Sequence, residues 1–442
     1  MKTIRLRRIA RGRAGSLALA LALAVACGAC GNLLDVSNPG AITVGNLNNP
    51  SMESAIVNGA LGAFQTAFSR TAFYGGIFVD ELIDRHTYQS DKPIDVRQID
   101  PSNDNIDVLV YQATQRSRGA ADNGLTQLQP ILGGGASSSL DVARLHDLGG
   151  YSLILLAETF CGAPIDMSAT KSPDDLLKLA VTHFNTAISV AAAARAAGRS
   201  AAAADSLTNL ANLGIARASL DLNDKTTALA KAQLVPANFQ WWANYSANAS
   251  AQYNFIGDQL RIGDEYAGYD PSLLGLNDPR IPQAAAPMPV PFNTSALIWL
   301  PFQGLQYSGF QPGQLVRIDR PTGILVGSGL EAQYIAAEAQ GPTAATLAFV
   351  NARRAVGNQP PVTYTGDQLM AELRQQKKID FFLSAHRLGD LRRYKRFSSV
   401  DNFPSGLWPG DNQTVYGTQV CMPLPNSEIN GNQTATQPPN QP

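Results

Sequence analysis

Apolar residues recur at three- and four-residue steps through most of the first half of the chain, a spacing that places them on one face of an α-helix. In the first such segment, Ile56, Ala60, Ala63, Phe64 and Phe68 follow one another. Helices are expected over residues 51–68, 107–128, 139–160, 174–194, 201–220 and 225–233. Short polar links favour stacked helical hairpins, as in tetratricopeptide arrays. Because no exact repeat period is present, the pattern by itself predicts only a mostly α-helical protein.

The segment from residue 235 to residue 329 has a different pattern. It holds ten of the 27 prolines, many glycines and three of the four tryptophans. Proline at this density excludes long helices, so we expect an irregular, loop-rich region. Helical spacing returns over 330–340, 343–356 and 366–396, and the tail from Asn426 is expected to be partly frayed. A long irregular insert in a helical scaffold usually carries function.

The N-terminus has the pattern of a secretory signal. Six basic residues precede the unbroken apolar run Leu17–Ala26, which is too short for a finished membrane span. The sequence Ala24-Val25-Ala26-Cys27 is typical of a lipobox, in which the cysteine is cut free and acylated. Cys30 is the alternative acceptor, and plain cleavage with free cysteines is the alternative outcome. Two or more acyl chains would anchor the protein stably to a membrane.

These patterns divide the chain into five parts. Residues 1–26 are the signal peptide, 27–49 a lipid-anchored tether, 50–234 an N-terminal helical region, 235–329 the irregular region, and 330–442 a C-terminal helical region with the tail. No later stretch approaches eighteen uninterrupted apolar residues, so no other membrane span is expected.

Charge and cysteine content narrow the possible partners. The whole chain has 34 basic and 35 acidic residues, and loss of the six basic residues of the leader leaves 28 against 35, a formal charge of −7. This balance argues against nucleic acid as the main partner. Beyond the leader junction only Cys161 and Cys421 remain. They form either a disulfide or two separately buried thiols, and two cysteines with scattered histidines do not make a zinc site.

Several segments along the chain together resemble the SusD/RagB family, in the order that this family uses. They are Asn32–Val36, Asp80–Leu82, Ala157–Ile165, Glu331–Ala339, Val350–Arg354, Ile379–Arg393 and Met422–Asn430. The sequence departs from the family pattern at Ala385, where glycine is frequent, and at Leu388, where an aromatic residue is common. Each motif alone is weak, but the ordered set covers essentially the whole mature chain.

The resemblance implies a mostly α fold, with tetratricopeptide-like helix pairs packed against an irregular lobe. It also implies a lipoprotein of the outer-membrane surface that is not an enzyme and needs no cofactor. Such a protein would bind an oligosaccharide and deliver it to a SusC-like TonB-dependent transporter. A surface glycan hydrolase, an oligopeptide-binding RagB-like lipoprotein and a helical scaffold without a small ligand are the alternatives.

Ligand capture needs aromatic side chains, because sugar rings present apolar C–H faces. The irregular region supplies Trp241, Trp242, Tyr245, Tyr253, Tyr266, Tyr269, Trp299, Tyr307 and Phe310. Most aromatic residues of any protein belong to its core. Trp299 and Tyr307 are the first candidates because they lie where the family often places binding aromatics. The loop after Asp80-Glu81 adds His86, Tyr88 and Gln89, whereas Asp80 and Glu81 are expected to fasten it.

His386 and Asp390 invite a catalytic interpretation, because residues four apart share one face of a helix. The surrounding residues are strongly basic, and the resemblance favours a structural role in which this helix is tied to its neighbours. The run Gly133-Gly134-Gly135 lacks the lysine of a phosphate-binding loop, so a flexible linker is the better interpretation.

Overall fold

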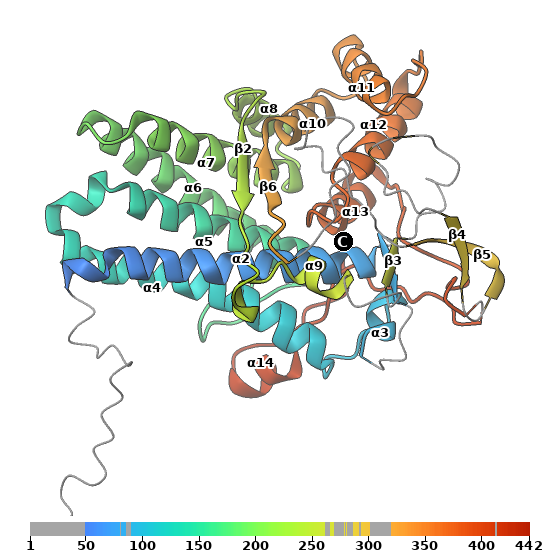
Figure 1. Cartoon of the computed structure of the whole chain (residues 1–442), viewed down its shortest axis with the longest axis horizontal. Helices are drawn as coiled ribbons and strands as arrows, with labels where there is room; N and C mark the ends of the chain where they lie inside the picture. Colours follow the sequence, from blue (N-terminus) through green and yellow to red (C-terminus); the bar gives the residue numbers. More distant parts are fainter. Residues whose placement is uncertain are drawn as a thin grey trace, which may run out of the picture. The chain divides into compact units, whose positions relative to one another are not determined.

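Helices form most of the chain that the computed structural model describes (Figure 1). The structure describes residues 49–79, 81–84, 90–260, 266–268, 278, 280, 286–290, 293–300, 320–411 and 413–442. At 260, 266–268, 286–290 and 293–300 it describes the backbone alone. The signal peptide, the tether to residue 48, Cys27 and Cys30 therefore lie outside the described residues.

The first half is a stack of helices in which each one packs against the next. Its elements are η2 (Pro50–Met52), α2 (Glu53–Phe78), α3 (Lys92–Asp95), a π-helical turn (Asn105–Tyr111), α4 (Gln112–Leu132), η4 (Gly133–Ser138), α5 (Leu140–Thr159), α6 (Pro173–Ala196), α7 (Ala201–Asp221) and α8 (Lys225–Ala232). Helix α2 packs on α4, α4 on α5, α5 on α6 and α6 on α7 (Figure 1). The mostly α fold with a hairpin array is confirmed.

Local signals explain where these helices begin. Ser172 is the N-cap of α6: its Oγ accepts a hydrogen bond from the backbone of Asp175 at 3.2 Å, and Pro173 is the first helical residue. Helix α2 was expected to end at Phe68 but continues to Phe78. Nearly every residue of this extension is buried, so it lacks the polar face on which helical periodicity depends. The glycine run forms the short helix η4 rather than a linker.

Glycine allows the closest contact in the stack. The ring of Phe184 on α6 lies against Gly150 of α5 and Gly214 of α7. A Cβ atom at these glycines would lie only 2.6 and 2.3 Å from the ring. The two glycines therefore let three helices meet around one buried aromatic side chain.

A two-stranded neck separates the irregular region from the stack. Strand β2 (Gln240–Ala243) leaves the stack after α8, and β6 (Ile324–Ser328) returns antiparallel to it, with Gln240 opposite Ser328. Helix α10 (Gly329–Gln340) follows at once and packs against α8 and α7. A Cβ at Gly329 would come within 2.2 Å of the Pro236 carbonyl oxygen, so glycine is required at this joint. The neck thus lets the helical stack continue past the insert.

The described part of the insert contains short elements. They are η5 (Ser250–Gln252), α9 (Phe255–Leu260), β3 (Tyr266–Gly268), β4 (Ala286–Val290) and β5 (Asn293–Leu300). With β1 (Leu82–Asp84) from the N-terminal region, the strands form a sheet in the order β1-β3-β5-β4. The longest described helix of the insert, α9, has six residues, as proline and glycine content predicts.

The C-terminal region adds α11 (Ala344–Val356), α12 (Gly366–Asp380), α13 (Arg387–Ser398) and α14 (Asn426–Gly431). The expectation of one helix over 366–396 is wrong, because α12 and α13 are separated by a turn. Within the turn, Leu383 and Ala385 have φ angles of 53° and 60°. These left-handed conformations end an α-helix, and no proline or glycine announces them in the sequence.

The tail is fixed to the body rather than frayed, so that expectation is also wrong. Cys161 and Cys421 form a disulfide with an S–S length of 2.00 Å. Beyond it, the Asn440 side chain accepts a hydrogen bond from the Val420 backbone at 2.9 Å, and the Thr170 hydroxyl donates to the Thr436 carbonyl oxygen at 2.7 Å. These contacts join the end of α5 and the segment before α6 to the C-terminal segment.

The main hydrophobic core of the described chain runs from Val57 to Ala435, a smaller cluster lies among α10, α11 and α12, and residues 50–442 form one compact unit. Among the described helices, α6 is the one long and apolar enough to cross a membrane by length and composition. It packs between α5 and α7, and its buried side chains belong to the core.

Candidate ligand-binding region and the buried charges around it

The small sheet brings together two segments that were singled out in the sequence. Leu82 of β1 pairs with Gly268 of β3, and Gly268 pairs in turn with Trp299 of β5. At about 4.8 Å between neighbouring strands, the backbones of Leu82 and Trp299 lie roughly 10 Å apart. The loop after β1 therefore starts on the same sheet as the strand that contains Trp299. Outside the described residues lie Tyr307, His86, Tyr88, Gln89 and Asp80.

Strand β1 is held firmly at its base. The buried Glu81 carboxylate accepts a hydrogen bond from the Leu383 backbone at 3.2 Å, and the Glu81 backbone donates to the Gly76 carbonyl oxygen at 2.9 Å. At the other end of the strand, the Asp84 backbone donates to the Asp95 carboxylate at 2.7 Å. The fastening role expected for Glu81 is what these contacts show. The loop that follows Asp84 departs from a fixed strand.

Some described aromatic residues of the insert pack on the core, and others line a cleft. Trp241 packs edge-on against Phe64, with ring centroids 6.0 Å apart, and the Tyr245 hydroxyl donates to the Gln65 carbonyl oxygen at 2.8 Å. Both fix the insert to α2. Tyr253 instead lines a cavity of about 470 Å³ between α2, α4 and residues 250–258. Sequence reasoning included Tyr253 among the aromatics but did not rank it.

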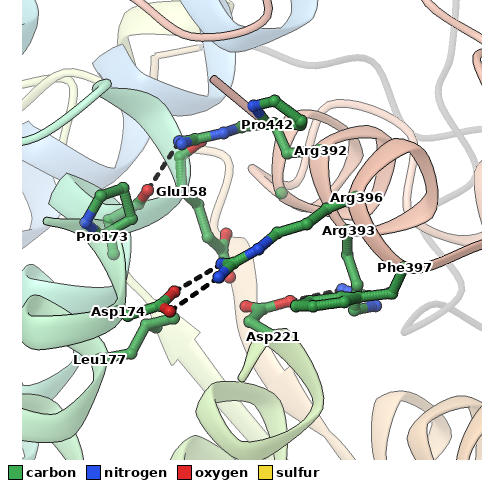
Figure 2. A pocket seen from close by; sticks show the side chains of 12 residues that line it. Glu158, Pro173, Asp174, Leu177, Asp221, Arg392, Arg393, Arg396, Phe397 and Pro442 are labelled. Carbon is green, nitrogen blue, oxygen red and sulfur yellow. Dashed lines mark hydrogen bonds and ion pairs between the residues drawn. The ribbon is translucent and has the colours of Figure 1, made fainter. Parts of the chain in front are cut away.

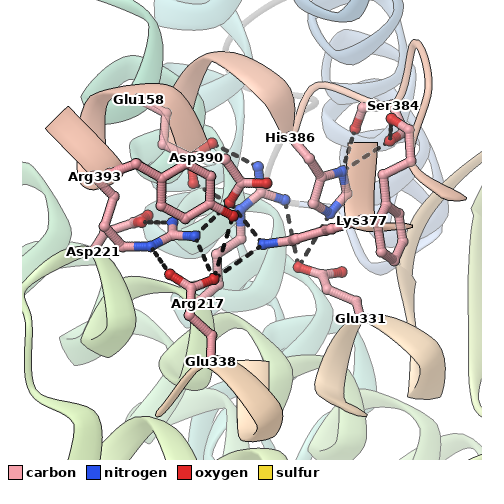
Figure 3. Close-up of polar contacts among 12 residues, drawn as sticks. Glu158, Arg217, Asp221, Glu331, Glu338, Lys377, Ser384, His386, Asp390 and Arg393 are labelled. Carbon is pink, nitrogen blue, oxygen red and sulfur yellow. Dashed lines mark hydrogen bonds and ion pairs between the residues drawn. The ribbon is translucent and has the colours of Figure 1, made fainter. Parts of the chain in front are cut away.

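A network of buried charges ties several helices together (Figure 3). Arg217 of α7 donates to both carboxylate oxygens of Glu158 on α5, at 2.7 and 2.6 Å. It also lies 3.6 Å from Glu331 of α10 and donates to the Ala385 carbonyl oxygen at 2.8 Å. The side chains of Arg217, Glu158 and Glu331 are at most 7% exposed. One guanidinium thus connects three helices and the turn before α13.

The same network continues onto α13 (Figure 3). Asp390 accepts hydrogen bonds from Lys377 at 2.6 Å and from Arg393 at 2.5 Å. Arg393 also donates to Glu338 at 2.8 Å and to Asp221 at 2.5 Å. Every cation here has a carboxylate partner, which is the condition for burying charge at tolerable cost.

His386 takes part as a packing residue. Its side chain is 4% exposed, with Nε2 3.2 Å from a Glu331 carboxylate oxygen and the ring stacked on Phe381 at 4.7 Å. Burial, together with the positive charge of Arg217, lowers the pKa of His386. Burial would lower the pKa of Arg217 itself, but Glu158 and Glu331 raise it above its ordinary value. The contacts of His386 and Asp390 match the structural interpretation of this helix.

A small pocket at the joint between α5, α6 and α13 is filled by the basic face of α13 (Figure 2). Arg392 donates to the backbone carbonyl oxygens of Ala157, Glu158 and Phe160 at the end of α5. Arg396 makes two hydrogen bonds to Asp174, at 2.6 and 2.8 Å. The remaining cavity of about 30 Å³ holds little more than one water molecule. Basic residues of this helix therefore donate hydrogen bonds to carbonyl and carboxylate groups of neighbouring helices.

A second hub links the insert to the C-terminal helices. Arg280 donates to Asp278 and, at 3.0 Å, to Asp380 of α12, which also accepts from Arg353 and from the Tyr334 hydroxyl. Among the described residues, no group of three or more histidine, cysteine, aspartate or glutamate side chains is arranged to hold a metal ion. The ion pairs of this hub link the insert to α11 and α12.

Sequence reasoning missed most members of the network, although its motifs contained them. Glu158, Glu331, Glu338, Asp390 and Arg393 each belong to a segment that carries the family resemblance. Those segments are far apart in the sequence and meet at this network. Charged residues inside predicted helical segments were the signal that could have indicated the network. A charged residue that is buried in such a segment needs a partner of opposite charge.

The architecture defines a class: a tetratricopeptide-like helical stack with a lobe inserted between two of its helices. The fold is that of the SusD superfamily. A SusD superfamily protein from Bacteroides thetaiotaomicron matches with a TM-score of 0.65 at 12% identity, covering 88% of this chain and 100% of that one. A SusD/RagB family protein from the same species gives 0.59 at 15% identity, over 86% and 94% of the two chains.

A third crystal structure, from Bacteroides vulgatus, is described as that of a candidate sugar-binding protein. It matches with a TM-score of 0.61 at 12% identity and covers 89% of this chain and 99% of that one. No family model and no curated protein matches the sequence. The resemblance predicted from the motifs is confirmed at the level of the fold.

Proposed function

We propose that the protein is a surface lipoprotein of the outer membrane that binds an oligosaccharide and delivers it to a SusC-like TonB-dependent transporter. The observation that carries this proposal is the SusD-superfamily fold, matched over the full length of a solved structure. The lipobox at Cys27 and the expected charge of the mature chain support it. The protein described as a candidate sugar-binding protein supports a carbohydrate as the ligand.

The ligand would be held near the small sheet, by residues of the loop after β1 and of the region around β5. His86, Tyr88 and Gln89 follow β1 in the sequence, and Trp299 lies on β5, with β3 between these two strands of the sheet. Tyr307 lies a short distance further along the chain. A rigid sheet with loops at its edge suits recognition, because the scaffold positions loops that carry the ligand contacts.

Binding of a glycan and peptide panel to the acylated protein tests this role. Trp299→Ala is expected to weaken binding of the captured ligand several-fold, because an aromatic contact contributes roughly 0.5–1.5 kcal/mol. Trp241→Phe, at a core aromatic outside the proposed site, is the matched control. Unchanged affinity in Trp299→Ala would remove this residue from the site, and turnover of a polysaccharide would replace capture by a hydrolase activity.

The anchor and the transporter partner need separate measurements. Metabolic labelling with a fatty-acid analogue should mark the wild type and be lost in Cys27→Ser, with Cys30→Ser as the control for the alternative acceptor. Affinity purification from the native outer membrane should recover a TonB-dependent barrel. An unlabelled protein in the periplasm without such a partner would contradict the proposal.

A further inference from the structure

The cleft between α2, α4 and residues 250–258 has an unbalanced positive charge. Arg70 of α2 and Arg116 of α4 both line it. In the part of the chain that the structure describes, neither guanidinium has a carboxylate partner: Arg70 lies 5.7 Å over the Phe255 ring, and Arg116 Nε donates to the Gln112 carbonyl oxygen at 3.3 Å. Of the residues lining the cleft only Asp258 is acidic, and it accepts a hydrogen bond from Arg320 at 2.7 Å.

These two cations act on each other across the cleft. Partial burial, and after it the charge of Arg116, lowers the pKa of Arg70. Both factors mean that the charged form of Arg70 lacks the stabilisation that water or an anion would give. A carboxylate placed between the two guanidinium groups would supply it through charge-assisted hydrogen bonds.

Aromatic rings form the other part of the lining. Phe255 is held in place by edge-on contact with Phe73 at 5.2 Å and by Tyr74 at 5.8 Å. Tyr253 is braced by Arg320, whose guanidinium lies 4.0 Å from the ring centroid. Both rings are therefore fixed before any ligand arrives, which lowers the entropic cost of binding.

Size and polarity also suit a small polar ligand. The volume of about 470 Å³ lies within the range of roughly 300–1,000 Å³ that small-molecule sites have. Thr66, Ser250 and Gln252 line the cleft with hydroxyl and amide groups. The lining thus combines two guanidinium groups that lack a carboxylate within the described chain, two fixed rings and neutral hydrogen-bonding groups.

We propose that this cleft binds an acidic saccharide, with Arg70 and Arg116 holding its carboxylate and the sugar ring lying beside Phe255 and Tyr253. The choice of a saccharide rests on the proposed function, whereas the choice of a carboxylate rests on the two arginines. The cleft is built from α2, α4 and residues 250–258, and none of its lining residues belongs to the sheet β1-β3-β5-β4.

Calorimetric titration of the acylated protein with trigalacturonate and with its methyl ester tests the inference. The ester keeps the sugar rings and removes the negative charge. The acid should bind at least about tenfold more tightly than the ester, because each charge-assisted hydrogen bond contributes more than a neutral one. Added salt should reduce the difference.

Arg116→Gln should weaken binding of the acid about tenfold, since one charge-assisted contact is lost. Arg116 is exposed, and within the described chain it makes no buried ion pair, so this variant is expected to fold normally. Arg199→Gln, at an exposed arginine beyond the end of α6, removes the same charge far along the chain and should leave affinity unchanged. Arg70→Gln should match Arg116→Gln, with circular dichroism confirming that the variant is folded.

Equal binding of acid and ester, equal affinity in Arg116→Gln and Arg199→Gln, or absence of binding would overturn the inference. Tighter binding of triglutamate than of trigalacturonate would overturn the choice of a saccharide. The proposed function fails differently: binding of a neutral glycan that is lost in Trp299→Ala but unaffected by Arg116→Gln would keep nutrient capture and reject the acidic site.

Discussion

Two groups of arginines in this molecule have opposite surroundings. Arg217 and Arg393 lie in the interior, and each makes hydrogen bonds with at least one carboxylate. Arg70 and Arg116 line an open cleft, and within the described chain neither has a carboxylate partner. The first pair joins five elements of the helical architecture: α5, α7, α10, α13 and the turn before α13. The second pair forms no such ionic links in the same part of the chain, so it can receive an anion from outside.

The comparison shows that partners, rather than residue type, distinguish a structural charge from a binding charge. A buried ion pair resists removal of either member, because the other is then left charged and unpaired. An exposed cation without a partner contributes little to stability and can be changed without unfolding the protein. Stability and ligand affinity should therefore respond to different arginines.

Arg217→Ala should have the largest effect on stability. It leaves Glu158 and Glu331 without their shared cation in the interior, at a cost of roughly 3–5 kcal/mol. Chemical denaturation followed by circular dichroism measures this free energy of unfolding. A loss below about 1 kcal/mol, the range of an exposed pair, would mean that the network does not hold the helices, and the contrast between the two groups would disappear.

Asp147→Asn tests a buried acidic group that, unlike the interior arginines, has no hydrogen-bond partner within the described chain. Asp147 of α5 is fully buried, and neither of its carboxylate oxygens has a hydrogen-bond partner within the described chain. Burial raises its pKa well above the ordinary value. Because the pKa is higher in the folded protein, protonation of Asp147 stabilises the folded state. This stabilisation is fully present below about pH 4, the pKa of the carboxyl in the unfolded chain, and is lost as the pH rises through its pKa in the folded protein.

Asn at position 147 removes this pH dependence. We expect the variant to be more stable than the wild type by about 1–2 kcal/mol at pH 7. The gain should vanish below about pH 3.5, where the wild-type carboxyl is mostly protonated in both states. Melting temperatures at the two pH values provide the measurement, and equal gains at both would show that the carboxyl is not the cause.

Ala385→Gly tests the turn that the network stabilises. Ala385 has a φ of 60°, its carbonyl oxygen accepts a hydrogen bond from Arg217, and glycine adopts this conformation without steric cost. Part of the gain is lost to the greater freedom of glycine in the unfolded chain, which leaves a net stabilisation of about 0.5 kcal/mol. Ala336→Gly, inside α10, is the contrasting variant and should destabilise the protein.

Arg116→Gln completes the series with no effect on unfolding beyond about 0.5 kcal/mol. The same variant is expected to lose affinity for an acidic saccharide, so stability and binding are separated in a single protein. A large loss of stability on this change would place Arg116 among the structural arginines.

Much of the helical architecture could be predicted from sequence, because amphipathic helices with polar links carry their own periodicity. Helix α6 begins within one residue of the predicted start, and α5 and α7 end within one residue of the predicted ends. The extension of α2 was missed because it is buried on all sides. The turn between α12 and α13 was missed because no local signal ends α12, and tertiary contacts to Glu81 and Arg217 hold the turn.

The candidate sites were less accessible to sequence reasoning. Trp299 and the loop after β1 were identified separately, but the presence of Trp299 and of the strand before this loop in one sheet depends on pairing between distant strands. The arginine cleft was missed, since an unpaired guanidinium cannot be recognised without knowing its neighbours. One local signal existed: Arg70 is the one charged residue of α2 after Glu53, in a largely buried stretch where a charge is unexpected.

The neck formed by β2 and β6 has a consequence for how this molecule can vary. The chain leaves and re-enters the helical stack at adjacent points, and between them Tyr245 and Phe255 contact α2 and Arg280 contacts α12. An insert that keeps these contacts can then change in length or composition with little adjustment of the supporting helices. Grafting a different recognition segment between Arg280 and Arg320 should accordingly redirect ligand choice on an unchanged frame.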